Sequence, residues 1–203
     1  MGGIAPMKGI CIRCLTTDLL EQKAEVHART WRETYSGLLS QELVDAITPA
    51  FALKVTRLHD FRTVLLAMDG DAVVGYAEYL NPARPPSTYP GAAEVAALYV
   101  LKQYQGRGIG RRLFEEAMAA TGVPKRIVVW MFRGNDRARA FYEHMGFHLT
   151  GRTQDADGIV GAEVELRIRY AGWNQRGFRG ERREAQGLGM TPMTPDVGVR
   201  HRC

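Results

Sequence analysis

Short apolar runs and helical patterns follow one another along this chain. Apolar runs at 95–100 and 126–132 show little alternation, as expected for strands covered on both faces. Apolar positions with helical spacing predict helices over 18–35 and 111–121. The order of elements predicts an α/β (α+β) fold, with a mixed, mostly antiparallel central sheet of about seven strands flanked by helices. The other strands are expected at 9–15, 63–68, 72–80, 147–152 and 162–170.

Local signals predict where several of these elements begin and end. Asp18 and Ser40 are expected to cap helices, and Asn135 or Asp136 another that ends at Gly146. The Asp-Gly-Asp sequence at 69–71 predicts a hairpin. Segment 81–91 holds four prolines and is expected to be a loop, as is 155–161.

Length and charge divide the chain unevenly. Its 203 residues suit one domain with a tail, and we expect the domain at 1–173 and a weakly ordered Arg/Gly-rich tail at 174–203. The net charge is +5, but six arginines against three acids place +3 of it in the tail. No basic face with interleaved aromatics stands out, which argues against nucleic acid as a partner. No apolar run reaches the ~20 residues of a membrane span, so we expect no membrane contact and a cytoplasmic location.

A glycine-rich turn, Gln-Gly-Arg-Gly-Ile-Gly at 105–110, carries the strongest functional signal. A strand that runs into such a turn and then into a helix presents free backbone N–H groups at a positive helix end, which suits phosphate. Neither the dinucleotide fingerprint nor the nucleoside-triphosphate loop matches the spacing of these glycines. The pattern that matches is Q/R-x-x-G-x-G/A, read as Gln105, Gly108 and Gly110.

A second block follows at 135–147, with the sequence Asn-Asp-Arg-Ala-Arg-Ala-Phe-Tyr-Glu-His-Met-Gly-Phe. With the glycine turn before it and a strand between the two, it resembles the Gcn5-related N-acetyltransferase (GNAT) superfamily over roughly 8–170. The resemblance implies the GNAT fold, acetyl-CoA as co-substrate and an amine acceptor. Dimers are common in this superfamily, so a homodimer is a partner that the resemblance allows.

The resemblance also implies which residues hold the coenzyme. The backbone of the strand before the turn would pair with the pantetheine arm, the N–H groups of the turn would hold the pyrophosphate, and Asn135 would contact the pantetheine. The expected coenzyme-binding residues are Leu98, Tyr99, Val100, Gln105, Gly106, Arg107, Gly108, Ile109, Gly110, Arg111 and Asn135.

Two residues are expected to carry the proton transfers. An alkyl amine with a pKa of ~10 must lose a proton before it attacks a thioester, and the leaving thiolate must gain one. Tyr142 matches the superfamily's tyrosine near the sulfur, and the alternative interpretation is core packing. Glu94 lies at the offset where histone-type members carry their basic glutamate. Glu78 is the reserve candidate, and a water chain is the other alternative.

The acceptor pocket is expected between the first helices and the loops at 81–91 and 155–161. Trp31, Tyr35 and Glu78 are the predicted substrate-binding residues, although the spacing of Trp31 and Tyr35 equally suits core packing. Residues 30–39 resemble the first helix of many small-molecule and polyamine members, which favours a free amine such as a polyamine. A protein or peptide acceptor and a non-catalytic acyl-CoA sensor remain alternatives.

A metal site is not expected from the sequence. The five histidines show no ligand spacing, and we interpret all of them as structural or solvated. Cys11 and Cys14 are three apart on a predicted strand, where their side chains face opposite sides.

Overall fold

The computed structural model describes residues 9–169 except 86, 88, 123, 125, 157 and 158. The predicted tail at 174–203 lies outside the described residues, and so does the proposed domain boundary at 173. Within the described part, seven strands form one sheet in the order β1-β2-β3-β4-β5-β7-β6, which confirms the expected fold class. The strands are β1 (Ile10–Cys14), β2 (Val64–Asp69), β3 (Ala72–Leu80), β4 (Ala92–Val100), β5 (Arg126–Phe132), β6 (His148–Ala156) and β7 (Ile159–Arg169).

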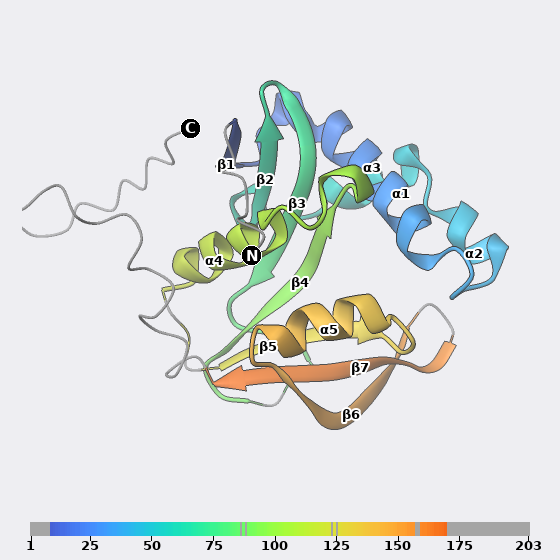
Figure 1. Cartoon of the computed structure of the whole chain (residues 1–203), viewed down its shortest axis with the longest axis vertical. Helices are drawn as coiled ribbons and strands as arrows, with labels where there is room; N and C mark the ends of the chain where they lie inside the picture. The colour runs from blue at the N-terminus through green and yellow to red at the C-terminus, as the bar shows by residue number, and fades with distance from the viewer. Residues whose placement is uncertain are drawn as a thin grey trace, which may run out of the picture.

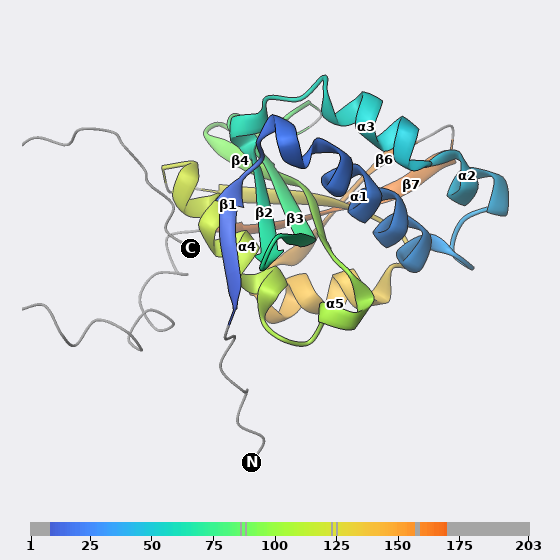
Figure 2. The ribbon, with the colours of Figure 1, turned by 90° about the horizontal axis from the view of Figure 1, so that it is seen from above.

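Helices cover both faces of this sheet (Figures 1 and 2). One face carries α1 (Leu20–Tyr35), α2 (Gln41–Ala46) and α3 (Pro49–Thr56), and the other carries α4 (Ile109–Ala120) and α5 (Asp136–His144). Three short 3-10 turns complete the described elements: η1 (Thr17–Leu19), η2 (Phe61–Thr63) and η3 (Lys102–Tyr104). The central strands are therefore buried on both faces, as β2 shows with its five consecutive buried residues.

Side chains alternate between these two faces along each strand. Tyr76 and Tyr99 are cross-strand partners on β3 and β4, and both rings contact His27 of α1. Glu78 shares the α1 face because it lies two residues beyond Tyr76 on β3. Val100, next to Tyr99, faces α4 instead. We call the side that carries Tyr76, Glu78 and Tyr99 the α1 face.

Several predicted boundaries are confirmed and two are wrong. Ser40 caps α2 through its hydroxyl, and Asn135 caps α5 by accepting a hydrogen bond from Ala138 N at 3.0 Å. Asp18 does not cap a helix, because the chain forms the 3-10 turn η1 there before α1 begins. The predicted loop at 155–161 is shorter than expected, because β6 runs to Ala156 and β7 begins at Ile159.

The sheet opens between β4 and β5, its only parallel pair among the described strands. These two strands pair from Ala92 with Arg126 to Val95 with Val129, and the pairing stops there. Beyond that point β4 continues to Val100 and β5 to Phe132, and the two strands diverge (Figure 1). A register shift between β3 and β4 leaves Ala96 as an extra residue where the divergence starts. The backbone of the second half of β4 is thus free to bind a ligand on its β5 side.

The described residues contain neither a candidate membrane span nor a candidate metal cluster. None of the helices there combines the length and the apolar character that a bilayer crossing requires. No group of three or more His, Cys, Asp or Glu side chains gathers into a possible metal site within the same residues.

Candidate active site

A cavity of about 520 Å³ occupies the opening between β4 and β5. Its walls come from the second half of β4, the glycine turn, the first turn of α4, the end of β5 and the inner face of α5. All but one of the expected coenzyme-binding residues line it, the exception being Arg107. Those that do are Leu98, Tyr99, Val100, Gln105, Gly106, Gly108, Ile109, Gly110, Arg111 and Asn135.

The glycine turn leaves its backbone open to a ligand. Gly106 and Gly108 have φ values of +74° and +80°, a left-handed conformation that favours glycine, and no atom lies within 4 Å of where a Cβ would stand. Gln105 holds the turn to the sheet because its Nε2 donates to Val100 O at 2.6 Å, and its Oε1 is buried with no hydrogen-bond partner among the described residues. The first N–H groups of α4 have no acceptor within the helix. This open turn fits the phosphate groups of a coenzyme.

Tyr142 and Asn135 meet the cavity from α5, as the sequence predicts. Tyr142 is 8% exposed and packs between Phe141 and Phe147, with ring centroids 5.2 and 5.4 Å away. Burial raises the pKa of the Tyr142 phenol, and nearby Tyr35 adds to this effect. The phenol therefore stays protonated at neutral pH and can act as a proton donor.

Two hydroxyl groups lie close together where α1 ends against β4. The Tyr35 and Tyr99 oxygens are 3.2 Å apart, and both residues line the cavity. Burial raises the pKa of both phenols. Tyr35, predicted as a substrate-binding residue, therefore lies at the wall of the cavity.

Trp31 has a different position from its neighbour on α1. It packs against Tyr35 and Phe132, with ring centroids 4.4 and 6.0 Å away, in a small cluster that also contains Val44. It is absent from the residues that line the cavity. Its spacing from Tyr35 therefore reflects packing in this structure. Tyr79 also faces away, because its hydroxyl donates to Arg62 O at 3.0 Å on the other side of β3.

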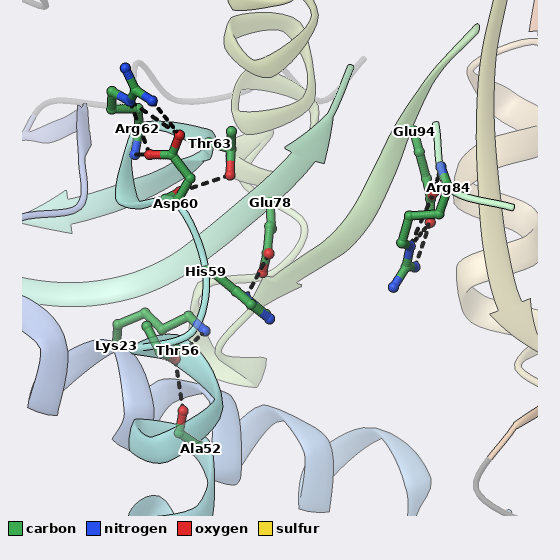
Figure 3. Close-up of polar contacts among 10 residues, drawn as sticks. All are labelled: Lys23, Ala52, Thr56, His59, Asp60, Arg62, Thr63, Glu78, Arg84 and Glu94. Atoms are coloured by element: carbon green, nitrogen blue, oxygen red, sulfur yellow. Dashed lines mark hydrogen bonds and ion pairs between the residues drawn. The ribbon is translucent and has the colours of Figure 1, made fainter. Parts of the chain in front are cut away.

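The Glu94 carboxylate is held by Arg84 from the 81–91 loop (Figure 3). Glu94 is 1% exposed, and it accepts hydrogen bonds from the Arg84 backbone N, at 3.0 Å, and from Nε and Nη2 of the guanidinium. Glu94 does not line the cavity either. Because its carboxylate is engaged by Arg84 and lies outside the cavity lining, this position does not fit the role predicted for Glu94.

Glu78 lies on the α1 face beside a second polar group (Figure 3). Its Oε1 is 2.7 Å from Nδ1 of His59, which follows α3. Behind this pair, the Lys23 ammonium is 1% exposed, donates to Thr56 Oγ1 at 2.8 Å and lies 4.4 Å from the centre of the Tyr76 ring. Burial lowers the pKa of Lys23 to about 8, against the opposing effect of Glu78.

The sequence does not predict three neighbours of the site, which are His59, Arg84 and Phe141. His59 was interpreted as structural or solvated, and Arg84 stands among the prolines of a loop. Their partners are 19 and 10 residues away in the sequence, and no spacing rule links them. Phe141 was named as a member of the second block, but its contact with the glycine turn was not expected. Its ring would lie 3.7 Å from a Cβ added at Gly110.

The chain is similar to known proteins in family pattern, in sequence and in fold. A model described as the acetyltransferase (GNAT) family matches residues 24–147. A probable N-acetyltransferase of Mycobacterium tuberculosis is 28% identical over 146 residues, which cover 70% of this chain and 81% of the relative.

Two further relatives are matched over smaller parts of their length. The N-alpha-acetyltransferase RimI of M. tuberculosis is 35% identical over 108 residues, 52% of this chain and 65% of RimI. A mycothiol acetyltransferase of Streptomyces coelicolor is 35% identical over 88 residues, 42% of this chain and only 25% of that protein.

Solved structures share the fold. The PaiA N-acetyltransferase of Thermoplasma acidophilum, solved in complex with coenzyme A, superposes with a TM-score of 0.59 at 24% identity, covering 79% of this chain and 99% of that one. The protein PH1933 of Pyrococcus horikoshii gives a TM-score of 0.62 at 24% identity over 79% of this chain and 98% of that one.

Proposed function

Because the chain belongs to the GNAT family of acetyltransferases, we propose that it transfers the acetyl group of acetyl-CoA to the primary amine of a small cationic molecule such as a polyamine. The transfer takes place by direct attack of the amine in a ternary complex. The observation that carries this proposal is the single cavity that joins the diverging edge of β4, the open glycine turn and the Tyr142 phenol.

The coenzyme-binding part of the proposal rests on backbone groups. Residues Leu98–Val100 lie beyond the last pair between β4 and β5, so this side of the strand is available to the amide groups of pantetheine. The N–H groups from Arg107 to Arg111 would hold the pyrophosphate, with the positive end of α4 behind them. Arg107 contributes through its backbone in this proposal, which agrees with the absence of its side chain from the cavity lining.

Tyr142 is proposed as the general acid. Bound acetyl-CoA supplies an acetyl thioester, whose sulfur needs a proton as it leaves. Tyr142 lines the cavity, and burial raises the pKa of its phenol, so the proton is in place before the reaction. Asn135 is held by its own cap bond to Ala138 N, which fixes the amide beside the cavity.

Negative charge on the acceptor side supports a cationic acceptor. The pKa of Arg84 is raised first by its hydrogen bond to Glu94, and Coulombic effects of Glu94, Glu163 and Glu78 add to this. Glu163 also raises the pKa of Tyr35, which lines the cavity. Carboxylates at these positions would attract the ammonium group of a cationic acceptor.

The second candidate is an N-terminal peptide acceptor, which the similarity to the N-alpha-acetyltransferase RimI favours. Thiol release from acetyl-CoA with a panel of amines separates the two, with polyamines, amino sugars, amino acids and peptides as acceptors. Polyamine turnover supports the proposal, and turnover of peptides alone supports the second candidate.

Tyr142→Phe tests the mechanism within the same assay. We expect kcat to fall by at least about 100-fold, because a general acid contributes that much, while calorimetry gives an unchanged Kd for acetyl-CoA. Absence of acetyl-CoA binding in the wild type would refute the function, and binding without turnover of any amine would identify an acyl-CoA sensor.

A further inference from the structure

His59 and Glu78 form a pair that bridges the sheet and the solvent. Glu78 belongs to β3, and its side chain is 10% exposed, whereas the His59 side chain is 35% exposed. The 2.7 Å contact joins Oε1 of the buried carboxylate to the Nδ1 atom of the imidazole. His59 Nδ1 is buried and makes no hydrogen bond of regular geometry within the described residues. The imidazole ring thus extends from a buried acid toward water.

The groups that face this pair come from four elements. The negative charge of Glu78 acts on Lys23 and His27 of α1 and raises the pKa of both. Burial lowers these pKa values by more. Tyr76 faces it from β3, and Arg84 from the 81–91 loop senses Glu78 as well. From α3, Thr56 engages the Lys23 ammonium, 2.8 Å away. Burial lowers the pKa of His27 to about 4, so His27 stays neutral at pH 7 and does not compete with His59 for a proton.

The pair lies next to the place of reaction. Glu78 is the direct cross-strand partner of Ala97, which lines the cavity. In an antiparallel pair such partners have Cα atoms about 4.5–5.5 Å apart. Glu94, another carboxylate on this side, is held by Arg84, and Glu163 accepts a hydrogen bond from Gln154. Glu78 does not itself line the cavity, but it lies next to Ala97, which does, and its partner is an imidazole rather than a guanidinium.

We propose that Glu78 and His59 form the route by which the acceptor amine loses its proton to solvent, an inference that rests on the proposed acetyltransferase function. The acceptor ammonium transfers one proton to the Glu78 carboxylate and becomes the neutral nucleophile. Glu78 passes that proton to Nδ1 of His59, which forms an imidazolium. The imidazolium releases one proton to water from its exposed edge. Glu78 returns to a carboxylate and His59 to a neutral ring that carries its proton on Nδ1. Exchange of ring protons with water restores the Nε2-protonated tautomer, so each turnover releases one proton to water and regenerates both groups.

The pH profile of kcat/KM for the acceptor tests this route. A histidine that must be neutral makes kcat/KM fall on the acidic side of the profile. We expect His59→Gln to remove this fall and to lower kcat/KM at pH 7 by about 100-fold, with recovery as the pH rises toward the ~10 of a free amine. Glu78→Gln should show the same loss and recovery. The KM for acetyl-CoA should stay constant in both variants.

Chemical rescue separates proton transfer from a structural effect. We expect imidazole in the buffer to restore activity to His59→Gly in a saturable manner, since the ring it replaces is partly exposed. His148→Gln is the matched control, because His148 is exposed on β6 at the edge of the sheet. That variant should keep the wild-type pH profile.

Two results separate failure of this route from failure of the function. If the wild type transfers acetyl groups and both His59→Gln and Glu78→Gln keep its pH profile, the route is refuted and the acetyltransferase function stands. If the wild type neither binds acetyl-CoA nor releases thiol, the proposed function fails and the route fails with it.

Discussion

Ionisable side chains that face the sheet from α1 are the least expected single residues in this fold. Lys23 is buried with its ammonium over the Tyr76 ring, and His27 stacks on Tyr99 with ring centroids 6.2 Å apart. Burial lowers the pKa of both side chains, to about 8 for Lys23 and about 4 for His27. Each is therefore less stable in its charged form than it is in water. Because the inner face of α1 beside the acceptor space carries these buried ionisable groups, the stability of the protein depends on pH.

His27 gives this dependence a testable form. Because its folded pKa lies near 4 and a free histidine titrates near ~6.5, the unfolded chain binds more protons in between. Its contribution to stability is complete above pH ~6.5 and is lost as the pH falls toward 4, by about 3 kcal/mol. We expect His27→Phe to flatten this part of the pH dependence in urea unfolding between pH 4 and 7. An unchanged slope would contradict the assignment, and His148→Gln should keep the wild-type slope.

The strand β4 shows, at the scale of elements, how the sheet is shaped for a ligand. Glu94 and Val95 pair on both sides, and residues 97–100 pair with β3 alone. Gly75 on β3 permits this close approach, since a Cβ there would lie 2.7 Å from Tyr99 O and 3.1 Å from Val100 Cγ2. The coenzyme-binding segment of β4 is therefore positioned by a residue on the neighbouring strand.

Gly75→Ala should disturb both stability and binding. The added methyl meets backbone, which cannot move as a flexible side chain can, so we expect a loss of about 1–3 kcal/mol in denaturant unfolding. Because Tyr99 and Val100 must shift, calorimetry should show a Kd for acetyl-CoA about tenfold higher.

Val73→Ala is the matched control on the same strand. Val73 is 5% exposed and pairs with Met68 of β2, away from β4. Its loss should lower stability by a similar amount with an unchanged Kd. An equal rise of Kd in both variants would show that Gly75 acts through stability alone.

Local signals predicted the elements better than the contacts between them. The hairpin at Gly70, the cap at Asn135 and the Gly108 turn each depend on a few adjacent residues, and all three are found in the structure. The role expected for Glu94 depends on what faces it, and its partner Arg84 lies in a proline-rich loop with no periodic pattern. Trp31 and Tyr35 share one helical face, yet only Tyr35 reaches the cavity, because Phe132 of a distant strand packs against Trp31.

The 81–91 loop ties together parts of the molecule that are distant in sequence. Asn81 donates to Thr121 O at the end of α4, at 3.0 Å, and Arg84 holds Glu94 of β4. At the other end of the loop, the Tyr89 hydroxyl donates to Glu165 of β7 at 3.3 Å, and the Arg167 guanidinium lies 4.5 Å from its ring. The loop thus spans the part of the sheet where β4 and β5 still pair, directly before they diverge.

A double-mutant cycle on Arg84 and Glu94 measures how much this tie contributes. Arg84→Met leaves the Glu94 carboxylate, which is 1% exposed, without its guanidinium. We expect the free energy of unfolding in urea to fall by about 2 kcal/mol. This is less than for a fully buried pair, because the Arg84 side chain is 56% exposed. Arg84→Met combined with Glu94→Gln should recover most of that loss, because the unpaired charge is gone.

The cycle also separates two roles for Glu94. If Glu94 only holds the 81–91 loop through Arg84, Glu94→Gln changes stability and leaves the shape of the pH profile of kcat/KM unchanged. If Glu94 is instead the general base, Glu94→Gln should lower kcat/KM by about 100-fold or more at neutral pH, and kcat/KM should recover at high pH. If the losses in the cycle are additive and Glu94→Gln also shows that recovery, Glu94 is the general base. The structural role of the Arg84–Glu94 pair would then be refuted.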